Sequence, residues 1–250
     1  MRKIILLTND DGYLSQGIRI LKTELEVYYD VIVVAPDRER SAISMALTLN
    51  EPLRIKEVDN KFFIINGTPS DCVNLGIRKI LNTKPDLVIS GMNTGENLSE
   101  DIFYSGTFAG AMSGYLFDIP SIAISLISDK ISYKEGRYDF ERGAHISKII
   151  VDKVLKVKDR FIYNVNIPYN DNGKIIKTKF GFKRYNPDII ENTDPRGGKY
   201  FWIGTGEPVY VLEEGNDIWA VRNNYVSLTV FKPDLKQFNY ELKEIDFDKI

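Results

Sequence analysis

The 250-residue sequence has one cysteine, one histidine and no long uninterrupted apolar run. Because Cys72 is alone, an intrachain disulfide framework is excluded. Lys plus Arg (33) and Asp plus Glu (35) nearly balance, so the excess of cations typical of proteins that bind nucleic acid polymers is missing. The run Ile119–Ile127 contains Pro120 and cannot span a bilayer, and the apolar run Ile4–Leu7 is too short for an export signal. We therefore expect a cytoplasmic protein without membrane or nucleic-acid partners.

What remains is the composition of an ordinary globular protein, with 43% apolar and 27% charged residues. The first 130 residues alternate short apolar runs with segments of helical spacing, such as Ile18, Leu21 and Leu25. Such alternation predicts a Rossmann-like three-layer α/β sandwich with a mostly parallel sheet. The strands are expected at Lys3–Thr8, Asp30–Ala35, Phe62–Asn66, Asp86–Ser90 and Ser121–Leu126. Helices are expected from Pro69, with Thr68 as N-cap and Asp71 completing a capping box, over Thr107–Leu116, and from about Gly143 to Lys156.

Two further segments depart from this alternation. Met45–Asn50 and Leu53–Val58 suggest a hairpin, and strands are expected again at Phe161–Ile167, Ile175–Phe182, Tyr200–Gly204 and Tyr225–Phe231. Lys183–Lys199, with two prolines and two glycines, is expected to be an exposed arm. We expect a single domain over 1–250, with a Rossmann-like core at 1–168 and a β-rich arm and oligomerisation extension at 169–250.

The first strand ends in Asn9-Asp10-Asp11-Gly12. Two adjacent carboxylates repel each other, and a divalent cation relieves that repulsion, while Gly12 permits a sharp turn. In a parallel sheet this position belongs to the edge where ligands bind. The alternative is a solvated turn in which Asp10 or Asp11 caps the next helix.

Three later segments are expected at the same edge of the sheet. Ser41 offers a hydroxyl after the second strand, and Asn93 and Asn97 offer amide groups in a glycine-containing loop. The run Ser105-Gly106-Thr107 begins a helix, where free N–H groups and the helix dipole attract anions. Ser105 or Thr107 could equally be a simple N-cap.

Together these residues predict a site for a hard divalent cation beside a phosphate-binding helix start. Oxygen donors suit Mg²⁺, Mn²⁺ or Ca²⁺ rather than thiolate-bound zinc. Hydrolysis of a phosphoester by a metal-activated water uses every part of such a site. We assign catalytic roles to Asn9, Asp10 and Asp11, and phosphate binding to Asn97, Ser105, Gly106 and Thr107.

Several ordered motifs resemble the SurE family of stationary-phase survival nucleotidases over almost the whole chain. They are LLTNDDG (Leu6–Gly12), VVAPDRERS (Val33–Ser41), NGTPSDCV (Asn66–Val73), PDLVISGMNTGEN (Pro85–Asn97), YSGT (Tyr104–Thr107), DPRGGKYFW (Asp194–Trp202) and VRNNYVSLT (Val221–Thr229). The resemblance implies that Asp10, Asp11, Ser41 and Asn93 bind one Mg²⁺ or Mn²⁺ per subunit. It also implies hydrolysis of nucleoside 5′- and 3′-monophosphates, with polyphosphate trimming in some members. A homodimer or homotetramer that exchanges its C-terminal extension is implied as well.

The sequence departs from the family pattern at three positions: Ala42 and Ser99 replace glycines, and Val230 replaces a proline. Two rival functions stay open. A haloacid-dehalogenase-type phosphatase would use Asp10 as nucleophile but needs its second aspartate two positions later, and a nucleotide or metal sensor could use the same fold. A redox Rossmann protein is excluded because the first loop lacks G-x-G-x-x-G. The one histidine, His145, is expected on a helix outside the site.

Overall fold

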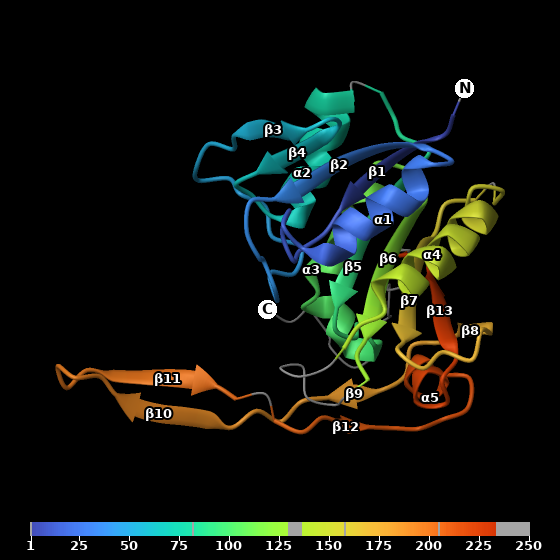
Figure 1. The fold of residues 1–250 in the computed structure, drawn as a ribbon. Coiled ribbons are helices and arrows are strands. Elements are labelled where there is room, and N and C mark those ends of the chain that lie inside the picture. The colour runs from blue at the N-terminus through green and yellow to red at the C-terminus, as the bar shows by residue number, and fades with distance from the viewer. Residues whose placement is uncertain (1, 82, 130–136, 158, 205, 234–250) are drawn as a thin grey trace, which may run out of the picture.

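The computed structural model describes residues 2–81, 83–129, 137–157, 159–204 and 206–233. Its centre is a nine-stranded sheet in the order β3-β4-β2-β1-β5-β6-β7-β13-β8 (Figure 1). Most neighbours are parallel, whereas β3 is antiparallel to β4 and β13 is antiparallel to β7. The strands are β1 (Ile4–Thr8), β2 (Asp30–Pro36), β3 (Ile55–Asp59), β4 (Phe62–Ile65), β5 (Leu87–Thr94), β6 (Ser121–Ile127), β7 (Ile162–Pro168), β8 (Ile175–Thr178) and β13 (Val226–Phe231).

Helices cover both faces of this sheet. The helices α1 (Gln16–Glu26) and α4 (Phe140–Val154) lie together on one face, and α2 (Pro69–Leu75) and α3 (Gly106–Leu116) lie on the other (Figure 1). Strand β1 is buried on both sides: Ile5 and Leu7 join the core under α1 and α4, while Leu6 packs with residues of α2. The predicted Rossmann-like α/β sandwich is therefore confirmed.

The local signals at helix starts act as expected. Thr68 caps α2 by accepting from the Asp71 N–H, and the Asp71 carboxylate accepts from the Thr68 N–H, which completes the predicted capping box. Helix α2 continues into a π-helical segment, η1 (Gly76–Leu81). No helix among the described residues is long and apolar enough to cross a membrane.

The predicted hairpin of Met45–Asn50 with Leu53–Val58 is wrong. Residues 45–50 form no strand, and β3 pairs instead with β4, across a turn in which Lys61 has a φ of 55°. The segment before β3 is held by tertiary contacts: the Ala46 carbonyl accepts from the Thr68 hydroxyl, and the Thr48 N–H donates to Asp71. These bonds replace the ladder that the apolar pattern suggested.

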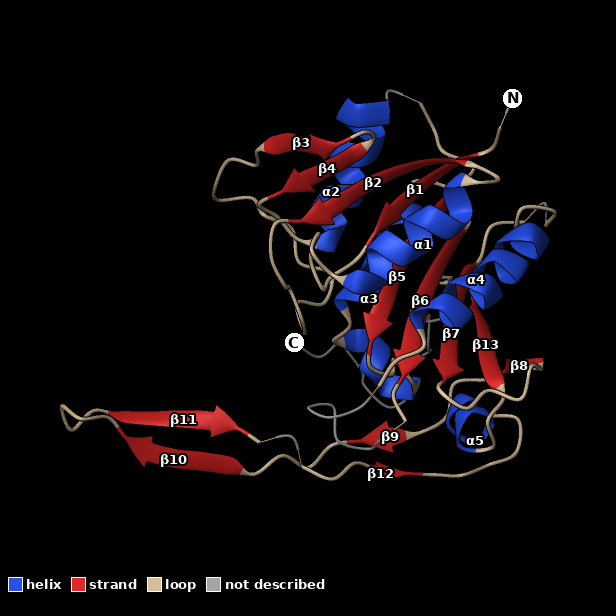
Figure 2. Ribbon diagram, viewed as in Figure 1, coloured by secondary structure: helices blue, strands red, loops and turns tan. Residues whose placement is uncertain are grey.

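An arm leaves the main sheet between β8 and β13, and it is exposed over most of the predicted range 183–199, although Lys183 itself is buried. Its base is the antiparallel pair β9 (Lys183–Arg184) and β12 (Val209–Tyr210), and its tip is the hairpin of β10 (Ile189–Thr193) and β11 (Lys199–Ile203). Every residue of β10 and β11 is exposed, and the hairpin projects from the body (Figure 2).

The arm does not account for the whole expected extension at 169–250. Strands β8 and β13 belong to the main sheet, and the short helix α5 (Asp217–Arg222) packs against β13. Residues 234–250, which we also assigned to the extension, lie outside the described residues.

Candidate active site

The candidate residues follow β1 and β2, lie at the end of β5 or just after it, and begin α3. Strand β1 lies between β2, the next strand in the chain, and β5, a later one. The direction in which successive strands are added to the sheet therefore changes at β1. Ligands of open α/β sheets bind at this switch point, beyond the carboxyl ends of the strands.

The loop after β1 is shaped by Asn9 and Gly12. The fully buried Asn9 donates from Nδ2 to the Gly12 carbonyl at 3.0 Å and to the Ser15 hydroxyl at 2.9 Å. Gly12 has a φ of 87°, and a Cβ there would lie 2.8 Å from the Arg38 carbonyl carbon. A side chain at residue 12 is therefore excluded both by its backbone conformation and by the loop that follows β2.

Asp10 lies against the start of α3. Its carboxylate is buried and accepts a hydrogen bond from the Thr107 hydroxyl. A Cβ at Gly106 would lie 2.8 Å from Asp10 Oδ2, so glycine is what allows this close approach. Burial raises the pKa of Asp10 to about 6, although the Thr107 bond opposes the shift.

Asp11 offers the carboxylate that best fits a divalent cation. Its Oδ1 accepts from the Thr94 hydroxyl at 3.4 Å, while its buried Oδ2 has no hydrogen-bond partner among the described residues. Burial, and then the charge of Asp10, raise the pKa of Asp11 to about 7. Two crowded carboxylates with an unsatisfied buried oxygen fit a divalent cation.

Ser41 lies on the loop that follows β2. Its hydroxyl is exposed and donates to Glu39 Oε1 at 2.6 Å, and the Glu39 charge contributes to the raised pKa of both aspartates. The N–H of Arg40 donates to the Asp10 carbonyl at 2.7 Å. The structure thus brings the Ser41 loop to Asp10, and it adds Glu39, which the sequence interpretation left unassigned.

Asn93 lies near the end of β5, where the pairing with β6 is irregular. Its Nδ2 donates to the Gly95 carbonyl at 2.9 Å, which leaves Oδ1 as the atom that could hold a cation. The next residue, Thr94, contacts Asp11, so the loop of Asn93 joins the site. Among the described residues no three His, Cys, Asp or Glu side chains form a metal cluster, so any cation here also needs neutral oxygens such as these.

Asn97 is anchored to β6 and β7 by hydrogen bonds. Its Nδ2 donates to the Ser125 hydroxyl at 2.8 Å, and its N–H donates to Asn166 Oδ1 at 2.9 Å. Its carbonyl accepts from the amides of both Asn164 and Asn166. These bonds make Asn97 an anchor of its loop, while its phosphate-binding role stays a prediction.

The start of α3 carries a side-chain cap, while its role as an anion site stays a prediction. Ser105 is the N-cap, because its hydroxyl accepts from the Phe108 N–H at 3.0 Å, whereas the Thr107 hydroxyl binds Asp10. Both hydroxyls are thus used within the protein. The Thr107 backbone N–H also donates to Asp10, so an anion would be bound by other backbone N–H groups at the start of the helix, such as that of Gly106.

Two of the departures from the family pattern lie in strained backbone. Ala42 has a φ of 54° and Ser99 a φ of 52°, a region that favours glycine. At Ser99 a hydrogen bond offsets part of the cost of this backbone conformation, because the Ser99 hydroxyl donates to Asp217 at 2.9 Å. Val230 packs half-buried against the main core from β13.

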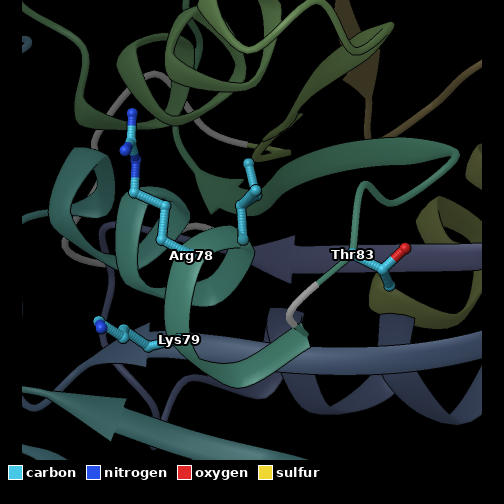
Figure 3. Close-up of a pocket in the computed structure, with 4 residues that line it drawn as sticks. Arg78, Lys79 and Thr83 are labelled. Atoms are coloured by element: carbon cyan, nitrogen blue, oxygen red, sulfur yellow. The ribbon is translucent and has the colours of Figure 1, made fainter.

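Two features lie outside the site. His145 is exposed on α4 and takes part in no contact described for the site. A pocket lined by Ile77, Arg78, Lys79 and Thr83 precedes β5, at the opposite edge of the sheet, and its two cationic side chains extend in different directions (Figure 3). It offers no converging donors.

Comparison with known proteins agrees with the motifs. The family model described as "Survival protein SurE" matches residues 5–187. The protein named 5′-nucleotidase SurE of Pelobacter propionicus is 42% identical over 240 residues, covering 94% of this chain and 95% of that protein. Its namesake in Aquifex aeolicus is 44% identical, with 93% of each chain covered. The crystal structure of the Aquifex aeolicus SurE protein superposes with a TM-score of 0.79 at 43% identity, covering 94% of this chain and 95% of that one. With a family model over most of its length and full-length relatives above 40% identity, this chain belongs to the SurE family.

Proposed function

We propose that this chain is a metal-dependent phosphomonoesterase that hydrolyses nucleoside 5′- and 3′-monophosphates to nucleoside and phosphate. The relatives it matches carry the name 5′-nucleotidase, which supports the reaction class. The observation that carries the proposal is the buried, unpartnered Asp11 Oδ2 beside Asp10, next to a helix N-terminus. A cation site adjoining an anion site is what a phosphate ester requires.

Asp10, Asp11, Ser41 and Asn93 are the residues that would hold one Mg²⁺ or Mn²⁺ per subunit. When bound, such an ion withdraws charge from phosphoryl oxygens and lowers the pKa of water. Thr107 orients Asp10 through its hydroxyl, and Asn9 keeps the loop after β1 in shape. The N–H groups at the start of α3 bind phosphate oxygens and stabilise the negative charge that develops on them. We assign a catalytic role to Asp10 and Asp11, while the contacts of Asn9 support a positioning role.

The exposed arm supports a homodimer or homotetramer. Its large apolar side chains are exposed to solvent in the single chain, and they include aromatic residues, which are enriched at protein–protein interfaces. They include Ile189 (61% exposed), Phe201 (57%), Trp202 (64%) and Ile203 (77%). Light scattering at micromolar concentration tests this assembly, and a monomer would refute it. We also propose a cytoplasmic location, consistent with the single, buried, unpaired Cys72.

Phosphate release by the purified full-length chain tests the reaction. We expect release from 5′- and 3′-nucleoside monophosphates with Mn²⁺ or Mg²⁺, slower release from short polyphosphate, and none after EDTA. Trapping of a phosphoaspartate would favour Asp10 as a nucleophile instead. Binding of nucleotide without turnover would indicate a sensor.

A further inference from the structure

The loop that carries Asn93 is tied to the base of the arm by a buried lysine. Lys183, in β9, is 3% exposed. Its Nζ lies 2.6 Å from Glu96 Oε1 and 2.7 Å from Asp101 Oδ2, and its backbone N–H donates to Glu100. One cation from the arm thus forms ion pairs with two carboxylates of the segment 96–101.

A second set of hydrogen bonds, also called a tether below, joins the same segment to Asp217, which follows the arm in sequence. Asp217 is fully buried and accepts from the Ser99 N–H at 2.7 Å and the Ser99 hydroxyl at 2.9 Å. It also accepts from the N–H of Gly181, two residues before Lys183, at 2.9 Å. The segment 96–101 is therefore held by residues that precede and follow the arm in sequence.

The tethered segment begins only a few residues after Asn93, one of the candidate metal ligands. Glu96 is two residues from Thr94, which contacts Asp11, and three from Asn93. Removing Lys183 would leave Glu96 and Asp101 as like charges in a nearly buried setting, and they would separate or take up water. Such a movement at Glu96 would reach Thr94 through two peptide units and Asn93 through three.

We propose that Lys183 is a positioning residue of the proposed hydrolase site: through Glu96 and Asp101 it holds the segment 93–101 so that Asn93 and Thr94 stay beside Asp11. This inference rests on the proposed function. Because Lys183 belongs to β9 at the base of the arm, the position of the arm would influence the affinity of the site for the metal.

The test is the Kd for Mn²⁺, followed by the electron paramagnetic resonance signal of the free ion, together with kcat and KM for a nucleoside monophosphate. For Lys183→Met we expect the Kd for Mn²⁺ to rise at least about tenfold, which corresponds to about 1.4 kcal/mol. Lys183→Arg keeps the charge and should restore the Kd to within about threefold of the wild type. At saturating Mn²⁺ most of the loss in kcat should be recovered, which a general loss of folded protein would not allow.

Ile150→Ala is the matched control, because it truncates a buried side chain of α4 that has no part in the tether. It should lower stability and leave the Kd for Mn²⁺ unchanged. If Lys183→Met fails to fold, Ser99→Ala tests the second tether and should raise the Kd about threefold. An unchanged Kd in these tether variants, or an equal rise in the control, overturns the inference alone. A wild-type chain that neither binds Mn²⁺ nor releases phosphate overturns the proposed function as well.

Discussion

Replacing Thr107 by valine tests the side-chain hydrogen bond that orients Asp10. The hydroxyl is fully buried and donates to the Asp10 carboxylate, and valine keeps the branched shape without the donor. A hydrogen bond to a charged group contributes about 1.5–3 kcal/mol. If that orientation is needed in the transition state, kcat/KM should fall about 10- to 150-fold, at about 1.4 kcal/mol per tenfold.

The assay is steady-state phosphate release from a nucleoside monophosphate at saturating Mn²⁺, with circular dichroism to check folding. Thr107→Ser should stay within about threefold of the wild type because it keeps the donor. Thr178→Val is the matched control: it removes a buried hydroxyl that contacts Ser227 at 2.8 Å and Thr229 at 2.7 Å, in β8 and far from the site in the sheet order. A folded Thr107→Val variant within twofold of wild-type kcat/KM would refute the orienting role, and so would an equal loss in Thr178→Val.

Three further outcomes are expected. Asp10→Asn and Asp11→Asn should each lower kcat at least about 100-fold in a folded chain, because they weaken the hold on the cation; activity in metal-stripped protein would contradict this. His145→Gln should change kcat/KM less than about threefold, well below the effect of removing a general acid or base, and steady-state kinetics would expose a larger loss. Ala42→Gly should raise the free energy of unfolding by about 0.5–1 kcal/mol, because glycine relieves the positive φ at the cost of some unfolded-state entropy; a lower melting temperature would argue against strain there.

The local patterns of the sequence were sufficient for the elements that depend on neighbouring residues. The apolar run of β1 is buried on both faces, as its lack of alternation predicted. The capping box at Thr68 formed because its two partners are three residues apart, within reach of one helical turn. The alternation of strands and helices likewise predicted that Asp10, Asp11 and Asn93 would belong to one edge of the sheet, whereas the adjacency of β1 and β5 comes from the structure.

Other features depend on contacts between distant segments, and the tertiary structure alone decided them. Residues 45–50 have a strand-like pattern, yet bonds to Thr68 and Asp71 hold them outside the sheet. The assignment of Thr107 to Asp10, rather than to the helix cap, required a contact across 97 positions of the chain. Lys183 belongs to a segment that composition marks as exposed, and it is buried because Glu96 and Asp101 supply the opposite charge from 87 and 82 positions away. Sequence periodicity reports which face of an element is apolar, but a lone charged residue shows no periodicity, and only the folded chain determines its partner.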